Sequence, residues 1–292
     1  MKKRISYNIR LLIVLFCAFI VLLPVIFIII NSFMSSGEAI ARYSSSVTPY
    51  NMLGVIDYRM RMHYVELTLL PDVISFSAYD RILLRDPTHL RFLWNSIILV
   101  VPIVLGQLVI APLAAYGFER TKSKHKDKLY FLYVITLLLP MQALLVPHFI
   151  IANFFGFNYL AIILPAVFGA FGVFLVRQQM RDFEVELIEA AKVDGASEFK
   201  AFYRIVIPCL RPTMTALAVL AFAEAWNIVD QAVVFIRDSY QMPLSTHLSV
   251  AVTGDIGVIF ALSTIFMLPA LIIFIYGQDS LSEGIGFTRV MK

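Results

Sequence analysis

The sequence predicts an all-α integral membrane protein with six transmembrane helices. Three observations support this fold class: long continuous apolar runs, an unusually hydrophobic composition, and basic residues concentrated in alternate connections. Hydrophobic residues make up 60% of the 292 residues and charged residues only 15%, whereas about 45–50% of a soluble domain is apolar. Only helices and closed barrels satisfy the backbone in hydrocarbon, and barrel strands would alternate polar and apolar residues.

Each apolar run of about 17–25 residues is long enough to cross the bilayer as a helix. The six predicted spans are residues 11–30, 94–117, 129–150, 160–176, 212–236 and 256–277. The first run follows basic residues, is too long for a signal peptide and lacks an obvious small-residue cleavage site, so we interpret it as a retained span. Prolines inside several runs favour kinks, which are tolerated where helices pack inside protein or line a cavity.

The distribution of basic residues predicts the orientation of the spans. Seventeen of the 24 Lys and Arg residues lie in the N-terminal segment, the 118–128 connection, the 177–211 connection and the C-terminal tail. The other seven lie in the 31–93 connection and in the last connection. Because basic residues are enriched on the cytoplasmic side, we expect both termini and residues 177–211 to lie inside the cell.

The external connection, residues 31–93, carries apolar residues at near-helical spacing in its second half. These residues are Val73, Ile74, Phe76, Tyr79, Ile82 and Leu83. The pattern is typical of an amphipathic helix that lies on the membrane interface. Contact with a partner protein is the alternative.

The 177–211 connection is charged and is interrupted by a glycine. Leu187, Ile188 and Ala191 share one face of a predicted helix. Gly195 is expected to end that helix in a left-handed conformation, and a second short helix then leads to Pro208. This second helix should present Phe199, Phe202, Tyr203 and Val206 on one side. Aromatic anchors for a partner's groove are one interpretation, and a hairpin resting on lipid headgroups is the other.

The spacing in this connection resembles a known signature. It reads Glu-Ala-Ala, three residues, Gly, nine residues, Ile, any residue, a hydrophobic residue and Pro, and it is similar to the EAA motif of permease subunits of ATP-binding-cassette (ABC) importers. The matching residues are Glu189, Ala190, Ala191, Gly195, Ile205 and Pro208, with Ile207 where the family usually has Leu. Further similarity covers Trp94-Asn95-Ser96, Pro140-Met141-Gln142, Gly172, Phe174-Leu175-Val176-Arg177-Gln178 and Ala225-Trp226-Asn227. These residues most resemble the second permease subunit of maltose-type carbohydrate importers.

The resemblance implies a MetI-like (type I) fold and a place in the bacterial or archaeal cell membrane. It implies four kinds of partner: a homologous second permease, two ATP-binding subunits, an extracytoplasmic solute-binding protein and membrane lipid. The residues expected to couple to the ATPase are Glu189, Ala190, Ala191, Asp194, Gly195, Phe199, Tyr203 and Pro208. In the family the loop helix seats in a cleft of the ATPase, the loop corresponding to 237–255 reaches toward the binding protein, and the solute is a sugar, oligosaccharide, polyol or glycerol phosphodiester.

The chain lacks the motifs of an ATPase or a hydrolase. No G-x4-G-K-[ST] phosphate loop and no H-E-x-x-H occurs, and the five histidines are scattered. We therefore expect no catalytic site, no metal and no cofactor on this chain, with ATP and Mg used by the partner. Cys17 and Cys209 lie in different settings and are interpreted as structural. The positive net charge is explained by the flanks of the spans rather than by nucleic acid.

Polar residues inside the spans are candidates for a solute path, because ionisable groups are costly in hydrocarbon. The candidates are Gln107, Gln142, Glu224, Asn227, Asp230 and Gln231. Glu224, Asn227 and Gln231 have the spacing i, i+3, i+7, which predicts one helix face directed at the path; hydrogen bonding between helices is the alternative.

The rival function is a proton-coupled secondary carrier in which Glu224 or Asp230 titrates. Such carriers commonly contain inverted repeats, and none is evident here. A membrane enzyme is a third possibility, but no cluster of residues supports it.

Overall fold

The computed structural model describes residues 2–43, 70–181, 185–250 and 255–286. In these residues the regular structure is helical, and the one extended pairing is an isolated bridge between Met34 and Ile74. The chain divides into two units, which are described separately. Unit 1 contains residues 1–90 and 248–267, and unit 2 contains residues 91–247 and 268–292.

Unit 1 is built on α1 (Lys2–Asn31), with α2 (Ser36–Tyr43), α3 (Ser77–Asp80) and the π-helix η1 (Arg81–Arg85). It also holds the first part of α15 (Ile256–Gly286). The aromatic rings of Phe27, Tyr43 and Phe260 contact one another edge to face, with centroids 5.5–6.1 Å apart. Ion pairs join Arg81 to Asp255 at 2.6 Å and Arg42 to Asp72 at 2.6 Å.

The predicted amphipathic helix in the second half of the 31–93 connection is shorter than its apolar pattern. Helical structure covers only α3 and η1, so Val73, Ile74 and Phe76 precede it. Ile82 is buried, whereas Val73, Ile74, Phe76 and Leu83 are exposed. The Tyr79 hydroxyl lies 2.7 Å from the Ser32 hydroxyl. One helix face therefore does not carry all six residues, although an exposed apolar surface remains.

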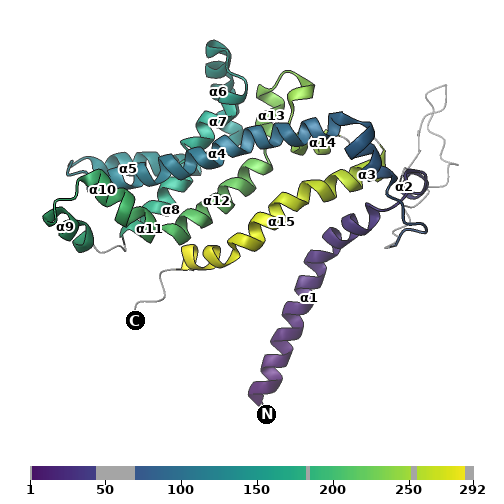
Figure 1. The fold of residues 1–292 in the computed structure, drawn as a ribbon, viewed down its shortest axis with the longest axis horizontal. Coiled ribbons are helices and arrows are strands. Elements are labelled where there is room, and N and C mark those ends of the chain that lie inside the picture. Colours follow the sequence, from purple (N-terminus) through teal and green to yellow (C-terminus); the bar gives the residue numbers. More distant parts are fainter. Residues whose placement is uncertain (1, 44–69, 182–184, 251–254, 287–292) are drawn as a thin grey trace. The chain divides into compact units, whose positions relative to one another are not determined.

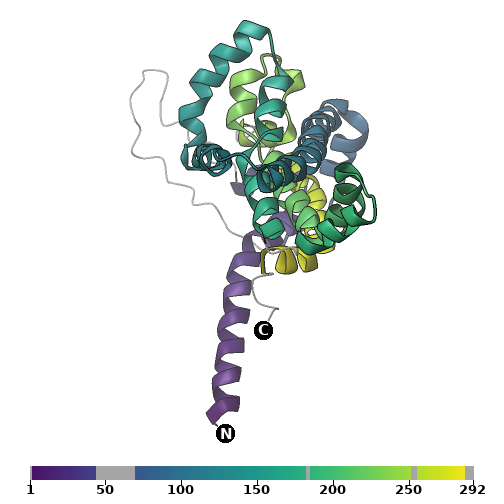
Figure 2. The ribbon, with the colours of Figure 1, turned by 90° about the vertical axis from the view of Figure 1, so that its left-hand side faces the viewer.

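Unit 2 contains most of the long apolar helices. They are α4 (Pro87–Arg120, whose first turn lies in unit 1), α5 (Lys126–Ile135), α6 (Met141–Phe155), α7 (Tyr159–Val167), α8 (Ala170–Arg181), α12 (Arg211–Trp226) and the second part of α15. Figures 1 and 2 place α6 and α7 beside the short helix α13 (Asp230–Phe235), while α9 to α11 lie at the far end of α4. Across the described residues of the whole chain, four helices qualify as membrane spans, or six if each of two bent pairs is one span.

The span predicted at 129–150 is not one straight helix. The short 3₁₀ turn η2 (Thr136–Leu138) follows α5, and the chain then bends by 106° before α6. Leu139 is extended, with φ −79° and ψ 125°, because Pro140 disfavours the helical conformation in the residue before it. The proline thus begins a new helix rather than kinking an existing one.

The span predicted at 212–236 is too long. Helix α12 ends at Trp226, and Asn227 forms its C-cap with φ −95° and ψ 13°. The Asn227 side chain donates to the carbonyl of Ala223 at 2.8 Å, which is the kind of local hydrogen bond that competes with helix continuation. Residues 230–235 form the separate helix α13.

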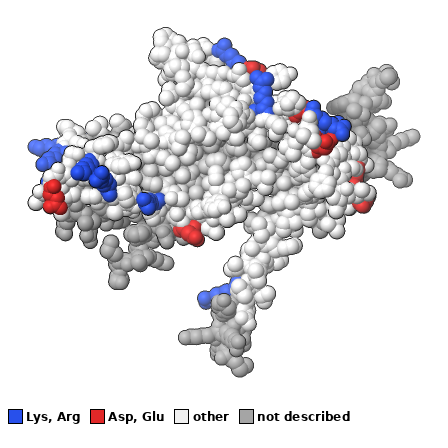
Figure 3. Space-filling model, in the orientation of Figure 1, with Lys and Arg blue, Asp and Glu red and all other residues white. Residues whose placement is uncertain are grey.

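Helices α4, α8 and α12 form the packed centre of unit 2. A Cβ at Gly172 of α8 would lie 3.1 Å from Leu217 of α12 and 3.2 Å from Ala111 of α4, so the glycine permits a close approach of three helices. On the face drawn in Figure 3, the surface over the middle of these helices carries no charged side chain, whereas charges gather over α9 and α10. This separation is the one expected of helices in hydrocarbon beside a segment in water.

Candidate functional site

The segment that carries the Glu-Ala-Ala pattern folds as a helix, a turn and a second helix. Helix α9 (Val185–Val193) ends before Gly195, whose φ of +84° is left-handed as predicted. The amide of Ala196 donates to the carbonyl of Ala191 at 2.9 Å, and that of Gly195 to Lys192 at 3.0 Å, which is the hydrogen-bond pattern of a glycine C-cap. The predicted conformation of Gly195 is therefore confirmed.

The second helix begins with an N-cap residue and changes from an α-helix to a π-helix after one turn. The hydroxyl of Ser197 accepts from the amide of Lys200, and α10 (Glu198–Ala201) continues into the π-helix η3 (Phe202–Val206) and α11 (Ile207–Cys209). The single apolar face predicted for Phe199, Phe202, Tyr203 and Val206 is wrong. Phe202 and Val206 are buried, and the ring of Phe202 packs on Tyr116 of α4 with centroids 4.9 Å apart.

The other two aromatic residues face away from this contact. Phe199 is 72% exposed and Tyr203 is 66% exposed. On α9, Glu189 and Ala190 are exposed, and Val193 is 88% exposed. We call these five residues the coupling surface. Large apolar side chains exposed beside charged residues are typical of a surface that contacts another protein or the membrane.

The remaining residues of the predicted coupling set are placed differently. Asp194, Gly195 and Pro208 are exposed, whereas Ala191 is half-buried. Ile188 of α9 is buried in the same apolar cluster as Phe202 and Val206, together with Ala111, Ala115, Val173, Val176 and Leu217. The apolar cluster thus fixes the inner side of the segment and leaves the coupling surface outside.

A carboxylate on α10 connects this segment to the end of α4. Glu198 accepts a hydrogen bond from the Tyr116 hydroxyl at 2.6 Å and from Arg120 Nε at 3.2 Å, and its other oxygen pairs with Lys192 of α9. Chiefly because of the hydrogen bond from Lys192, and then that from Tyr116, the pKa of Glu198 falls to about 2. The carboxylate is therefore charged at any physiological pH.

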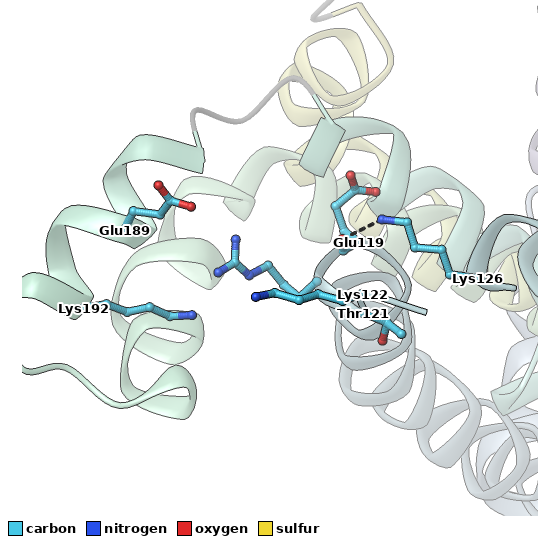
Figure 4. A pocket seen from close by; sticks show the side chains of 7 residues that line it. Glu119, Thr121, Lys122, Lys126, Glu189 and Lys192 are labelled. Atoms are coloured by element: carbon cyan, nitrogen blue, oxygen red, sulfur yellow. Dashed lines mark hydrogen bonds between the residues drawn. The ribbon is translucent and has the colours of Figure 1, made fainter. Parts of the chain in front are cut away.

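A cavity of about 560 Å³ includes in its lining Arg120 and Lys192, two of the groups that pair with Glu198. It is lined by Glu119, Arg120, Thr121, Lys122, Lys126, Glu189 and Lys192. Figure 4 shows Glu189 and Lys192 on one side of the gap and Lys122 and Thr121 on the other. Lys126 donates to the carbonyl of Glu119 at 3.3 Å. Next to the cavity, α9 and the end of α4 are separated rather than packed.

Arg177 of α8 was noted in the sequence only as part of the resemblance, and its contacts were not predicted. Its side chain is 5% exposed and pairs with Glu119 at 3.2 Å and with Asp127 at 3.3 Å. Its guanidinium carbon lies 3.7 Å from the centroid of the Tyr130 ring. The signal in the sequence was a cation at the end of an apolar run with carboxylates in the preceding connection. Arg177 joins α8 to α4 and α5.

The residues predicted for a solute path do not share one helix. Glu224 and Asn227 are exposed, but α12 ends at Trp226, so Gln231 belongs to α13 and is half-buried. The prediction of one common face is therefore wrong in its geometry. Asp230 is exposed and begins α13. The polar groups thus cluster around the break between α12 and α13.

Two other polar candidates have different surroundings. Gln107 is buried and donates from α4 to the carbonyl of Ala166 in α7 at 2.8 Å, which is a hydrogen bond between helices rather than a position on a path. Gln142, in the first turn of α6, is exposed.

The start of the last external connection is held against neighbouring helices. Asn95 of α4 donates to the carbonyls of Tyr240 and Met242 at 2.8 and 3.0 Å. The hydroxyl of Ser96 accepts from the amide of Leu244 at 2.8 Å. These bonds explain what Asn95 and Ser96, noted only as a sequence resemblance, do in the fold. Residues 251–254 of this connection lie outside the described residues.

The same connection is tied to α6 and α7. Arg237 donates to Asn153 at 2.7 Å, Asn158 donates to Gln241 at 3.2 Å, and the Tyr159 hydroxyl donates to the Gln241 carbonyl. Arg237, Asp238, Ser239 and Tyr240 remain exposed. The connection therefore has an exposed polar surface, residues 237–240, which we call the external polar surface.

Residues 97–285 match the family model described as binding-protein-dependent transport system inner membrane component. The chain belongs to this family. It is therefore a membrane-embedded component of a transport system, and the family consists of transport subunits rather than enzymes. The matched region includes α9, Gly195, the coupling surface and the break between α12 and α13.

Curated relatives are permease proteins of sugar transport systems. The lactose transport system permease protein of Rhizobium radiobacter is 30% identical over 196 residues, covering 65% of this chain and 72% of that protein. The arabinooligosaccharides transport system permease protein of Halalkalibacterium halodurans is 24% identical and covers 92% and 91%. The diacetylchitobiose uptake system permease protein of Streptomyces coelicolor is 24% identical and covers 91% and 84%.

A solved structure supports the fold over nearly the whole chain. A bacterial ABC transporter involved in the import of the acidic polysaccharide alginate aligns with a TM-score of 0.77 at 21% identity, covering 96% of this chain and 97% of that chain. A second structure, of the alginate transporter in complex with an alginate pentasaccharide-bound periplasmic protein, aligns with a TM-score of 0.58 at 16% identity over 73% of this chain and 84% of that chain. The all-α importer-permease fold predicted from the sequence is confirmed.

Proposed function

We propose that this permease is one of two homologous subunits of an ATP-driven, binding-protein-dependent importer for a sugar or oligosaccharide. The observation that carries the proposal is the coupling surface: exposed apolar and charged residues beside a glycine turn, on the side of the membrane where basic residues predict the cytoplasm. A separate pair of ATP-binding subunits docks there and uses ATP and Mg. The carbohydrate class is supported by the relatives named as lactose, arabinooligosaccharide and diacetylchitobiose permeases.

The docking contact is anchored by Phe199 and Tyr203, two exposed aromatic residues one helical turn apart on the second helix. Aromatic residues in a partner's pocket supply most of the binding energy of such contacts. Ala190 allows the partner's surface to approach α9 closely, because its side chain is small and exposed. Movement of the ATPases toward each other would then displace α9 and alternate the access of the cavity between the two permeases.

The external polar surface, residues 237–240, is the docking site for the solute-binding protein. Residues 237–240 are exposed, but hydrogen bonds fix Tyr240 to α4 and Arg237 to α6, and the adjoining Gln241 is bonded to Tyr159 of α7. A fixed polar surface binds a partner with a smaller loss of conformational entropy than a mobile loop does. The solute then passes near the break between α12 and α13, where Glu224 and Asn227 are exposed.

Site-specific photocrosslinking tests the docking contact. A photoreactive residue at Phe199 or Tyr203 should capture the ATP-binding subunit in membranes. The matched control is Tyr276 of α15, which is an exposed aromatic residue in a predicted span and should capture no ATPase. Equal capture from Tyr276 and from Phe199, or none from either Phe199 or Tyr203, contradicts the proposal.

The path assignment has its own test. Asn227→Leu removes the exposed amide at the end of α12. We expect uptake to fall while assembly with the partner subunits is retained. Unchanged uptake in a fully assembled complex contradicts the assignment of Asn227 to the path.

A further inference from the structure

We call α9 to α11, residues 185–209, the coupling segment. Its polar contacts with α4 converge on one side chain. In the described part of the chain, the ion pairs and side-chain hydrogen bonds that link α9 or α10 to α4 all include Glu198. Two of its partners, Tyr116 and Arg120, lie in the last two turns of α4, and the third, Lys192, lies in the last turn of α9. One carboxylate therefore touches both the element that bears the coupling surface and a spanning helix.

Two other features surround the contact between α9, α10 and α4: an open cavity and a buried apolar cluster. The cavity of about 560 Å³ separates Lys122, two residues after the end of α4, from Glu189 and Lys192 on α9. Ile188, Phe202 and Val206 belong to the same buried apolar cluster as Ala115 of α4. Apolar contacts hold the segment to the core, but they are not directional. The hydrogen bonds of Glu198 are directional and set the register between the two elements.

The N-terminal part of α4 is also held by hydrogen bonds. Asn95 and Ser96 bind the backbone of residues 240–244 in the external connection. Asn95 and Tyr116 are separated by roughly 32 Å along a helix, since the rise is about 1.5 Å per residue, and this length is close to the thickness of the hydrocarbon core. Helix α4 is thus held by polar contacts near both of its ends, at opposite sides of the membrane.

We propose that Glu198 is a positioning residue that fastens α9 and α10 to the end of α4, so that α4 carries ATP-driven movement to the external connection. The inference rests on the proposed function, because it requires an ATPase that moves α9. In the intact complex α9, α4 and residues 240–244 move as one body. Without the carboxylate, α9 moves while α4 lags behind it.

Distances between spin labels test the proposal in the purified complex with its ATPase subunits. Cys17 and Cys209 are first replaced by Ser, because both are exposed. One label pair joins Val193 of α9 to Leu113 of α4, and a second joins Val193 to Ser239; all three positions are exposed. Each distance is measured without nucleotide and with Mg and a non-hydrolysable ATP analogue.

In the parent protein both distances should stay constant on addition of the analogue. In Glu198→Gln the Val193–Leu113 distance should change by about 2 Å or more, the size of common helix shifts at interfaces. Tyr116→Phe keeps the ring contact with Phe202 and removes only the hydroxyl, so it should give a smaller change in the same direction. Lys128→Gln, an exposed cation of α5, is the control and should leave both distances constant.

Two further measurements distinguish a failure of the proposed function from a failure of the role of Glu198. Co-purification of the ATPase and its hydrolysis of ATP report on the proposed function, and their absence from the parent complex contradicts that function. If both are present, constant distances in Glu198→Gln and Tyr116→Phe overturn the role of Glu198. A double variant that shifts no further than Glu198→Gln alone is expected, because both residues act through one contact.

Discussion

Gly195 offers a sharp perturbation of the coupling segment. Its φ is +84°, and a Cβ built on it meets nothing within 4 Å. Replacement therefore costs backbone energy without a steric clash. For an L-residue the left-handed conformation costs about 1–2 kcal/mol, which changes an equilibrium by a factor of about 5–30.

The identity of the substituent should set the size of the effect. Asn adopts the left-handed conformation more readily than other residues with a side chain, so Gly195→Asn should retain most of the transport rate. Gly195→Ala should lose more, and the β-branched Gly195→Val should lose most. The assay is ATP-driven uptake in proteoliposomes, together with co-purification of the ATPase. We expect weaker ATPase binding and lower uptake in the same order, with normal insertion of the permease into the membrane.

The volume of the side chain provides the control for this reasoning. Asn is larger than Ala, so a steric account predicts a greater loss in Gly195→Asn, and a conformational account predicts a smaller one. Equal uptake in the Val and Asn variants would refute the argument. So would normal transport in Gly195→Val, because the turn between α9 and α10 would then have no mechanical role.

The other predictions concern charged residues outside the hydrocarbon. Arg177→Gln should lower the thermal unfolding midpoint in detergent, because it removes a buried guanidinium that pairs with Glu119 and Asp127, and hydrogen bonds to charged groups contribute about 1.5–3 kcal/mol. Arg181→Gln at an exposed site of α8 should not lower it; equal shifts contradict this. The folded pKa of Glu198 is about 2, below an unfolded value near 4.3. The ionised Glu198 therefore contributes to folding stability at pH values above its unfolded pKa, and this contribution is lost as the pH falls toward its folded pKa. The stability difference between the parent and Glu198→Gln should be constant from pH 8 to 5 and shrink below about pH 4, and a change between pH 8 and 6 contradicts the assignment.

The sequence predicted features that depend on local chemistry. Continuous apolar runs indicated the spanning helices, and Gly195 indicated a left-handed turn, because only a few residues adopt that conformation at low cost. The residue order around the Glu-Ala-Ala pattern indicated a helix, a glycine turn and a second helix, which the structure shows. Each of these signals lies within a few residues of the feature that it predicts.

Features that depend on distant residues were not predicted. Two local breaks were also missed, because hydropathy alone treats the runs that contain Pro140 and Asn227 as single spans. The inward position of Phe202 depends on Tyr116, which is 86 residues earlier in the chain. The contacts of Glu198 and Arg177 likewise join different helices, so no periodic pattern could reveal them.

ATP-driven transport by the reconstituted complex tests the central claim most directly. The permease, its partner permease, its ATPases and its loaded binding protein are combined in proteoliposomes, and uptake is measured with a proton uncoupler and, separately, without the ATPase. The account predicts that uptake continues with the uncoupler and stops without the ATPase. Uptake that collapses with the uncoupler but persists without the ATPase would instead establish a proton-coupled carrier.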